Sequence, residues 1–245
     1  MNILNKIKKI HQKEQINPSF LGMFVNPFYF ARKGLYDGML EFSPLLSGSI
    51  LDIGCGDKPY KDLFVNVNNY IGLEIDDRRN REMSLADYFY DGKEFPFENK
   101  SYDGILSNQV FEHIFNPNEF LKEVNRVLKQ DGLFLITVPF VWDEHEQPYD
   151  YARYSSFGIK HVLNKHGFEI VKNIKTNNGI GTIAQLLNTY IFKTINTKNG
   201  YINIILTILL MSPINILGTV FAKLTPKNND LYLDNIVLAR KKRDA

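Results

Sequence analysis

The chain has 245 residues, of which 44% are hydrophobic and 23% charged, so it is long enough to bury the core of an α/β domain. Its formal net charge of +2 argues against a dedicated nucleic-acid-binding protein, which is usually far more basic. The single cysteine, Cys55, excludes an internal disulfide and a cysteine-based zinc site. Such sparse cysteine usage is typical of a reducing compartment, and we therefore expect a cytoplasmic protein.

The first segment, residues 1–47, is predicted to form a helical cover. Apolar residues near its start share one face of a helix whose other face carries lysines, namely Ile3, Leu4, Ile7 and Ile10. This helix either packs on the core or on the edge of a cleft, or it lies on a membrane surface. No apolar run of signal-peptide length follows the lysines, so no secretory leader is expected here. A second helix is predicted over 35–46.

Strand and helix signals then alternate along residues 48–178 and return at 231–240, which together are predicted to form the core. Strands are expected at 49–54, 70–75, 102–107, 133–138, 168–174 and 231–239. Helix start and stop signals predict one helix from Asn116 to Gly132 and another from Ser155 to Gly167. This alternation predicts an α/β fold with a doubly wound, mostly parallel sheet.

Two of the predicted strands end in residues suited to binding a nucleoside. The run Ser49-Ile50-Leu51-Asp52-Ile53-Gly54-Cys55-Gly56 reads as a buried strand that turns sharply into a loop able to approach a ligand. About twenty residues later, Tyr70-Ile71-Gly72-Leu73-Glu74-Ile75-Asp76 reads as a strand that ends in acids. In α/β nucleotide binders an acid at this place accepts hydrogen bonds from ribose hydroxyls. The pair therefore predicts a cofactor that contains a nucleoside.

From here the sequence resembles the class I S-adenosylmethionine-dependent methyltransferases, in particular the group called the methyltransferase type eleven domain. The matching pieces occur in family order over roughly residues 45–175. They are Leu51-Asp52-Ile53-Gly54-Cys55-Gly56, Gly72-Leu73-Glu74, Asp91 with Pro96-Phe97, Ser101-Tyr102-Asp103-Gly104-Ile105-Leu106-Ser107-Asn108, Glu112-His113-Ile114, Arg126-Val127-Leu128-Lys129-Gln130-Asp131-Gly132 and Thr137-Val138-Pro139. The resemblance implies a seven-stranded sheet whose last strand is antiparallel, with S-adenosylmethionine as the cofactor.

One position departs from the family pattern. Lys58, followed by Pro59, stands where many members have a third glycine, so we expect a slightly different loop path near the methionine end of the cofactor. Pro59 also replaces the last glycine of the dinucleotide-binding pattern Gly-x-Gly-x-x-Gly. This disfavours a pyrophosphate-containing dinucleotide.

The resemblance also assigns cofactor-binding roles to individual residues. The turn Gly54-Cys55-Gly56 would approach the methionine moiety, with Cys55 itself expected to be a small packed residue rather than a nucleophile. Asp52 would favour the ammonium group, directly or through water, and Glu74 would accept both ribose hydroxyls. Asp91 would accept from the adenine amino group, and Asn108 would line the cofactor near the methyl. Each of these acids has the alternative of merely capping a following helix.

The methyl acceptor is expected to meet the segment 141–154, which follows a predicted strand and is dense in His, acids and tyrosines. Similar His-Glu-x-Pro-x-Asp-x-x-Arg-Tyr loops occur in a subgroup of these methyltransferases. We predict His145 as a general base, because imidazole titrates close to neutral pH. Asp150 would orient His145, and Arg153 or Tyr149 would orient the acceptor. The alternative is a loop made rigid by an Asp150–Arg153 salt bridge.

Other residues bear on a metal and on the class of acceptor. Glu112-His113 could join a divalent metal, as in some relatives, but is expected to pack at the start of a helix, so no metal site is predicted. The motif Asn/Asp/Ser-Pro-Pro-aromatic of many DNA and protein amino-methyltransferases would begin at Ser107, where the sequence instead continues Asn108-Gln109-Val110. By family analogy a small-molecule hydroxyl is the favoured acceptor.

Residues 179–230 form an apolar helical insertion before the last predicted strand. No charged residue lies between Lys198 and Lys223. A single transmembrane span is nevertheless rejected, because the chain must return to the sheet and because Pro213 is expected to divide the run into two short segments. Two interpretations stay open: a helical hairpin that packs on the domain or forms a homodimer, and a patch over 199–223 that dips into the inner face of a membrane.

The sequence therefore predicts S-adenosylmethionine-dependent methyl transfer to a small-molecule or lipid-linked acceptor, in the first place to a hydroxyl oxygen. The competing hypothesis is a non-catalytic protein that binds the cofactor or a partner with the same fold. The intact set of Asp52, Gly54, Gly56 and Glu74 argues against that second hypothesis.

Overall fold

The computed structural model describes residues 3–243, and of residues 3–9 only the backbone. The chain divides into two compact units, Met1–Asp37 with Lys175–Asp234 and Gly38–Ile174 with Asn235–Ala245. We call the first the helical unit and the second the sheet unit. The residues predicted as an N-terminal cover and those predicted as an insertion thus fall, for the most part, in one and the same unit.

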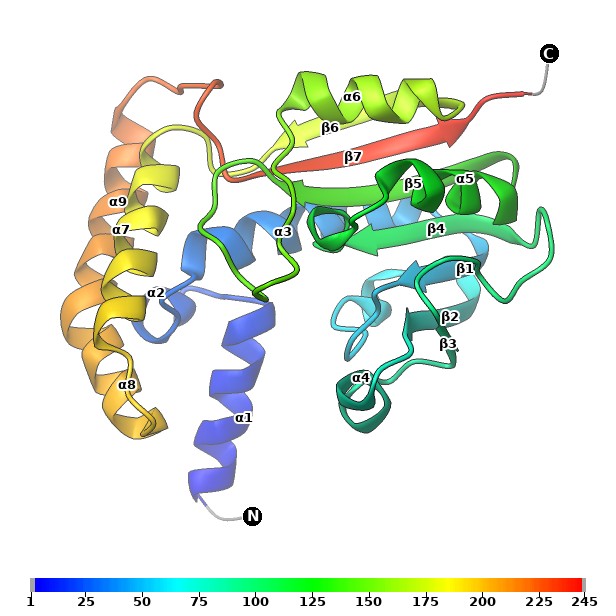
Figure 1. Cartoon of the computed structure of the whole chain (residues 1–245). Coiled ribbons are helices and arrows are strands. Elements are labelled where there is room, and N and C mark those ends of the chain that lie inside the picture. Colours follow the sequence, from blue (N-terminus) through cyan, green and yellow to red (C-terminus); the bar gives the residue numbers. More distant parts are fainter. Residues whose placement is uncertain (1–2, 244–245) are drawn as a thin grey trace. The chain divides into compact units, whose positions relative to one another are not determined.

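The sheet unit is built on a seven-stranded sheet with the order β3-β2-β1-β4-β5-β7-β6 (Figure 1). Its strands are β1 Gly48–Ile53, β2 Val67–Ile75, β3 Tyr88–Tyr90, β4 Tyr102–Asn108, β5 Leu128–Pro139, β6 Phe168–Lys175 and β7 Asp234–Lys241. The β1–β2, β1–β4, β2–β3 and β4–β5 pairs are parallel. In Figure 1 the arrow of β7 runs opposite to those of β5 and β6. The predicted fold class is therefore confirmed.

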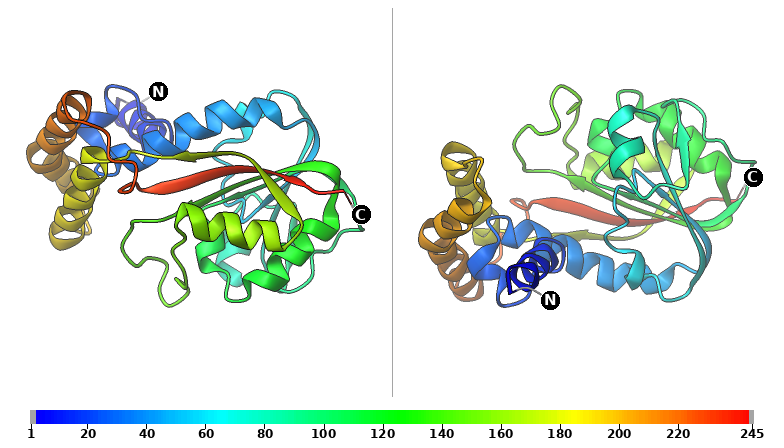
Figure 2. Two further views of the ribbon diagram at one scale, coloured as in Figure 1. Left: turned by 90° about the horizontal axis from the view of Figure 1, so that it is seen from above. Right: turned by 90° about the horizontal axis from the view of Figure 1, so that it is seen from below.

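Helices cover both faces of this sheet (Figure 2). On one face lie α5 (Pro117–Val127) and α6 (Ser156–Lys165), and on the other lies the end of α3 (Tyr29–Phe42). The α5 side chains Leu121, Val124 and Val127 are fully buried in the core. The central strands are buried on both faces, which explains their almost continuous apolar sequences.

Some local predictions were wrong. The helix expected to reach Gly132 ends at Val127, because β5 already begins at Leu128 and pairs there with Tyr102 of β4. The short strand β3 and the short helix α4 (Arg78–Met83) were not predicted. The first turn of α4 is held by the Asp77 carboxylate, which accepts the Asn80 N–H at 2.7 Å. Three 3-10 turns, Ser43–Leu45, Lys61–Leu63 and Phe111–His113, complete this unit's helices within the described residues.

The helical unit contains α1 (Ile3–Ile16), α2 (Gly22–Val25), the start of α3, α7 (Ile180–Ile195), α8 (Gly200–Leu206) and α9 (Ser212–Leu224). The backbone of α1 confirms the predicted N-terminal helix. Of its predicted apolar face, Ile3, Leu4 and Ile7 lie outside the residues whose side chains are described.

The insertion does not break at Pro213 as predicted. A π-helical segment, Thr207–Met211, joins α8 to α9, so that Gly200–Leu224 is one helix of 25 residues. The Ser212 N–H reaches back five residues to the Thr207 carbonyl, and this wider turn accommodates the proline ring and its missing N–H. By length and composition alone this helix could cross a membrane.

Candidate active site

Several predicted site residues meet at one edge of the sheet, where the parallel strands β1, β2 and β4 end. Asp52 near the end of β1 lies beside Gly72 of β2 and Leu106 of β4. Glu74 is the penultimate residue of β2, and Asn108 is the last residue of β4. Open α/β sheets bind their ligands at this edge, so the topology collects these side chains where a ligand is expected.

The turn after β1 is held against β2 by its backbone. The N–H of Gly54 donates to the Leu73 carbonyl at 2.9 Å, and the N–H of Gly56 donates to Glu74 Oε2 at 3.0 Å. Both glycines have positive φ, 70° and 46°. A Cβ added at Gly56 would meet no other atom within 4 Å, so the backbone is open on this side. The turn therefore fits the predicted approach to the cofactor.

The carboxylates beside this turn differ in environment. Asp52 is 3% exposed and accepts a hydrogen bond of 2.6 Å from the Tyr70 hydroxyl. Burial raises the pKa of Asp52 to about 7, although the Tyr70 hydroxyl acts in the opposite direction. Burial likewise raises the pKa of the half-buried Glu74, against the effect of the Gly56 N–H. Two carboxylates beside a glycine turn are suitable hydrogen-bond acceptors for a ligand that carries ammonium and ribose hydroxyl groups.

Lys58 stands where many family members have a third glycine, and the structure shows how a lysine fits this position. It adopts a φ of 53°, the left-handed backbone conformation that a glycine would allow more easily. Its Nζ forms an ion pair of 2.5 Å with Asp87, whose carboxylate also accepts the Gly72 N–H at 2.7 Å. Lys58 thus ties the turn, through Asp87, to Gly72 of β2.

The remaining predicted cofactor residues are placed as follows. Cys55 is buried, and burial raises the pKa of its thiol to about 12, which agrees with the expected packing role and not with a nucleophile. Asp91 is exposed just after β3 and accepts the Lys93 N–H at 3.0 Å. Asn108 Oδ1 accepts a hydrogen bond of 2.8 Å from the hydroxyl of Thr137, a fully buried residue of β5. Thr137 was not singled out from the sequence, although it fixes the orientation of the Asn108 amide.

The loop after β5 is organised around Asp150. This carboxylate is 4% exposed and forms a bidentate ion pair with the two terminal nitrogens of Arg153, each at 2.6 Å. It also accepts the backbone N–H of His145 at 2.9 Å and lies 3.3 Å from His145 Nδ1. The predicted Asp150–Arg153 salt bridge is therefore present, and the same carboxylate also contacts His145.

Tyr149 is accessible to a methyl acceptor, whereas Arg153 is engaged in contacts within the loop. Besides Asp150, the Arg153 guanidinium donates to the carbonyls of Asp143 and Ala152, both at 2.8 Å. These contacts favour a structural role for Arg153. Tyr149 is 62% exposed, so its ring is accessible to a bound molecule.

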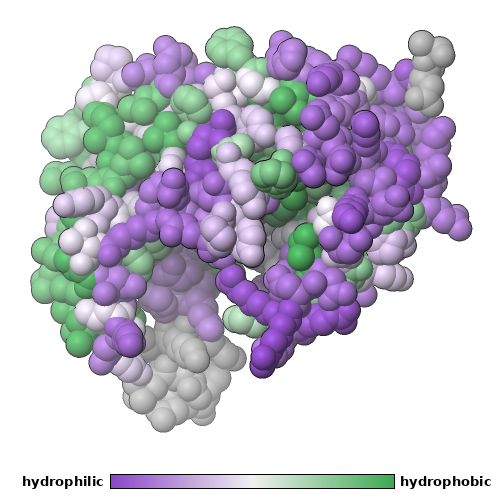
Figure 3. All heavy atoms as spheres, in the orientation of Figure 1, coloured by the Kyte–Doolittle hydropathy of each residue, from purple (hydrophilic) through white to green (hydrophobic). Residues whose placement is uncertain are grey.

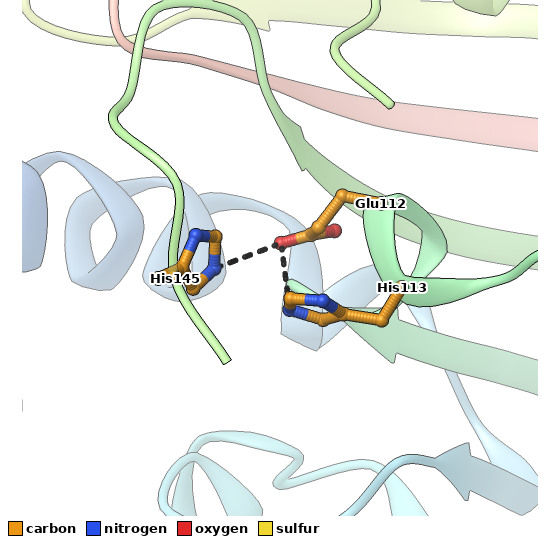
Figure 4. A group of neighbouring side chains, drawn as sticks. All are labelled: Glu112, His113 and His145. Atoms are coloured by element: carbon orange, nitrogen blue, oxygen red, sulfur yellow. Dashed lines mark ion pairs between the residues drawn. The ribbon is translucent and has the colours of Figure 1, made fainter. Parts of the chain in front are cut away.

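Glu112, His113 and His145 form a further cluster that joins the end of β4 to the loop after β5 (Figure 4). Glu112 is fully buried, and its Oε1 lies 3.9 Å from Nε2 of His113 and 3.9 Å from Nε2 of His145. His113 Nδ1 lies 2.8 Å from the Tyr149 carbonyl, and burial lowers the pKa of the His113 imidazole. Two imidazoles and a carboxylate within 4.8 Å are groups of the kind that bind divalent transition metals. The sequence pointed to Glu112 and His113 only as a pair and did not join His145 to them.

The ion pair of Asp150 and Arg153 makes a testable contribution to stability. Replacing Arg153 by leucine should lower the free energy of unfolding near pH 7 by about 2–4 kcal/mol, because it leaves a buried carboxylate without its partner. Arg153 lowers the pKa of Asp150 to about 2. The stabilisation is therefore present above about pH 4 and is lost as the pH falls through about 2.

Urea unfolding of the full chain between about pH 7 and pH 2 measures this effect. The difference in the free energy of unfolding between wild type and Arg153→Leu should shrink as Asp150 becomes protonated. Arg78→Leu is a matched control, because the Arg78 side chain is 90% exposed. A difference that stayed constant over the whole pH range would exclude the ion pair as its cause.

Comparison with known proteins gives a family and a fold. The model of a family described as "Methyltransferase domain" matches residues 28–173. A probable S-adenosylmethionine-dependent methyltransferase of Mycolicibacterium smegmatis is 27% identical over 149 residues, 56% of this chain and 58% of that protein. An uncharacterized protein of Methanocaldococcus jannaschii is 31% identical over 147 residues, 57% of this chain and 51% of that protein. The chain thus spans a little over half the length of these relatives.

Among solved structures, phosphoethanolamine N-methyltransferase 2 of Haemonchus contortus in complex with S-adenosyl-L-methionine has a similar fold. It aligns with a TM-score of 0.53 at 18% sequence identity, over 94% of this chain and 59% of that one.

Proposed function

The chain belongs to the methyltransferase domain family, and we propose that it methylates a hydroxyl oxygen of a small-molecule or lipid-linked acceptor. Its cofactor is S-adenosylmethionine. When bound, this cofactor supplies a methyl group on a positively charged sulfur, which is already a strong electrophile. The observation that supports cofactor binding is the glycine turn after β1, which is hydrogen-bonded to Glu74 and open at Gly56. The choice of a hydroxyl acceptor is supported by the contact of His145 with Asp150.

We assign the cofactor contacts to residues at the edge of the sheet. The backbone of Gly54-Cys55-Gly56 would hold the methionine end, with Asp52 opposite the ammonium group. Glu74 would accept from the ribose hydroxyls with the oxygen lone pairs that the Gly56 N–H leaves available. Asp91 would accept from the adenine amino group, and Asn108 would lie near the methyl.

The raised pKa of Asp52 makes cofactor affinity depend on pH. A cation beside Asp52 favours the carboxylate, whose pKa without ligand is about 7. We therefore expect the affinity for S-adenosylmethionine to rise several-fold between about pH 6 and pH 7.5. Asp52→Asn should weaken binding and remove most of this rise.

The same residue predicts the opposite trend for stability without ligand. Because the folded chain holds the Asp52 proton more tightly than the unfolded chain, this contribution is present below about pH 4 and is lost as the pH rises through about 7. Titration calorimetry and thermal unfolding at matched pH measure the two trends. A cofactor affinity that is flat with pH in the wild type would contradict the role of Asp52.

His145 is proposed as the general base that accepts the proton of the acceptor hydroxyl. Its Nδ1 lies 3.3 Å from the Asp143 carbonyl and 3.3 Å from Asp150 Oδ2, and 3.4 Å from the donor Nη2 of Arg153. We assign a proton to Nδ1, because two acceptors face this nitrogen and only one donor does. Nε2 is then the nitrogen that takes up the proton. Glu112, 3.9 Å from Nε2, would stabilise the imidazolium that forms. Tyr149 is proposed to contact the acceptor.

A hydroxyl is favoured over an amine as acceptor for a chemical reason. A neutral amine already presents its lone pair, whereas a hydroxyl gains from a base that removes its proton during the transfer, and an imidazole oriented by a buried carboxylate provides that base. The Haemonchus protein named above acts on phosphoethanolamine nitrogen by its name, so an amine acceptor is the natural comparison.

The test is transfer of a labelled methyl group. Purified chain is incubated with methyl-labelled S-adenosylmethionine and with matched pairs of acceptors, each alcohol beside the amine of the same skeleton. Label in an ether product supports the proposal, and label in the amine products alone contradicts the choice of oxygen. Binding of the cofactor without transfer to any acceptor, including lipid-linked ones, would favour the non-catalytic alternative.

The place of the protein in the cell is part of the same proposal. The single cysteine, buried and reduced, supports a cytoplasmic location. Contact with a membrane through 199–223 and a homodimer through the same surface are alternatives, because both would cover the same apolar side chains.

A further inference from the structure

Between α7 and the helix Gly200–Leu224 many buried residues are polar or small, and they lie beside apolar ones such as Ala184 and Met211. In α7 the fully buried side chains include Thr182, Gln185 and Asn188. The helix α9 packs against α7, and its buried residues are Ser212, Asn215 and Gly218. Buried polar side chains on this scale are informative, because a core is ordinarily filled with Ile, Leu, Val and Phe.

These buried polar groups are hydrogen-bonded to one another and to nearby backbone. Asn188 Nδ2 donates to Asn215 Oδ1 at 2.8 Å, and Asn215 Nδ2 donates to the Met23 and Asn26 carbonyls at 3.0 and 3.1 Å. At Gly218 a Cβ would lie 2.7 Å from Ala184 Cβ, so the two helices approach too closely there for any side chain. Close packing through small residues and interhelical amide hydrogen bonds is how helices associate within a bilayer.

Most of the large apolar side chains with the greatest exposure in the helical unit lie on these same helices. On Gly200–Leu224 five large apolar side chains, Ile205, Leu209, Leu217, Phe221 and Leu224, are 49–73% exposed. On α7 the side chains of Ile183, Leu187 and Tyr190 are exposed as well. Within the most apolar 18-residue stretch of the helix Gly200–Leu224, only 28% is buried. Figure 3 shows hydrophobic residues gathered over α7, α8 and α9.

The charges in this segment all have one sign. Between Lys175 and Asp230 there is no Asp or Glu, and the charged residues are Lys193, Lys198, Lys223 and Lys227. They stand near the ends of the two helices, where the long lysine side chains can reach lipid headgroups while the apolar side chains between them stay in the acyl region. A second copy of the chain would bring the same positive charges together, whereas an anionic lipid surface complements them.

The helix lengths indicate how deep the hairpin can go. At a rise of about 1.5 Å per residue, α7 is roughly 24 Å long and falls short of the hydrocarbon thickness of about 30 Å. An upright hairpin would therefore leave Lys198, in the turn between the helices, inside the hydrocarbon. A hairpin that lies in the plane of the membrane keeps Lys198 at the level of the headgroups and avoids the free-energy cost of placing its charge in hydrocarbon.

We propose that α7 and the helix Gly200–Leu224 form a monotopic membrane hairpin that lies in the headgroup–acyl boundary of an anionic bilayer, with its outward apolar side chains in the lipid. The inference goes beyond the proposed reaction and does not depend on it. It also explains why this hairpin buries polar side chains and exposes apolar ones, because its outer face would contact hydrocarbon instead of water.

The experiment is flotation of the purified full chain with phosphatidylcholine vesicles, with and without phosphatidylglycerol. We expect the chain to float with the anionic vesicles and to bind neutral vesicles about tenfold less. The triple variant Leu209→Ser, Leu217→Ser, Phe221→Ser should lose binding to both. Changing the four lysines, Lys193, Lys198, Lys223 and Lys227, to glutamine should remove the preference for anionic vesicles but retain the weaker binding.

Controls separate loss of lipid contact from loss of folding. The matched variant Val65→Ser, Phe115→Ser, Phe157→Ser changes three exposed apolar side chains of the sheet unit and should float like wild type. Calorimetry with S-adenosylmethionine checks that every variant still binds cofactor, so failure of the proposed function is recognised separately. A chain that stays off both kinds of vesicle would overturn the proposal, as would a stable dimer that the serine triple variant dissociates.

Discussion

Replacing His145 by alanine is expected to lower the turnover number by about 10²–10⁴-fold, the usual contribution of a positioned general base. The affinity for S-adenosylmethionine should change by less than about twofold, because the predicted cofactor residues lie at the ends of β1, β2, β3 and β4 and not in the loop after β5. Initial rates with the acceptor found by the labelled-methyl assay, together with calorimetry of cofactor binding, measure the two effects.

His161→Ala is the matched control, because His161 is an exposed imidazole on α6 and should leave both quantities unchanged. Asp150→Asn tests the positioning of His145. It keeps an oxygen that can accept the His145 backbone N–H but loses the negative charge beside Nδ1, so it should lower turnover and shift the pH profile of the rate. If His145→Ala weakened cofactor binding and left turnover intact, His145 would not be the base.

Replacing Glu74 by alanine is expected to weaken S-adenosylmethionine binding by about 1–3 kcal/mol, or roughly 5- to 150-fold in Kd. The change removes the predicted acceptor of the ribose hydroxyls. It also removes the acceptor of the Gly56 N–H, which holds the glycine turn against β2. Titration calorimetry of the full chain gives the number directly.

Glu74→Gln distinguishes these two losses, since an amide oxygen can still accept the Gly56 N–H. We expect it to bind more tightly than Glu74→Ala and more weakly than wild type. Glu119→Ala, an exposed acid in the first turn of α5, is the control for general charge effects. Equal affinity of Glu74→Ala and wild type would remove Glu74 from the site.

The strands β1 and β2 and the glycine turn between them could be predicted from sequence because their determinants are local. Apolar strand sequences that end in Asp52 and Glu74, and glycines placed directly after a strand, identify both the strands and the turn. The fold class follows from the alternation of strands and helices, and it is confirmed. The resemblance to class I S-adenosylmethionine-dependent methyltransferases is confirmed by the match of the family over residues 28–173.

The rest depends on contacts between segments that no local pattern links. Glu112 and His145 are 33 positions apart, and only the parallel pairing of β4 with β5 brings the two loops together. Thr137 carries no chemical signal of its own until it is seen bonded to Asn108. Pro213 predicted a break, because the sequence does not show that a π-helical turn can absorb it.

The proposed methyl transfer requires that the turn at 54–56 and Glu74 together hold S-adenosylmethionine. Calorimetric titration of the folded full chain with S-adenosylmethionine and with its demethylated product tests it most directly. We predict saturable binding of both compounds at one site per chain, weakened in Glu74→Ala. Absence of any binding by wild-type protein whose fold is intact would contradict the central claim.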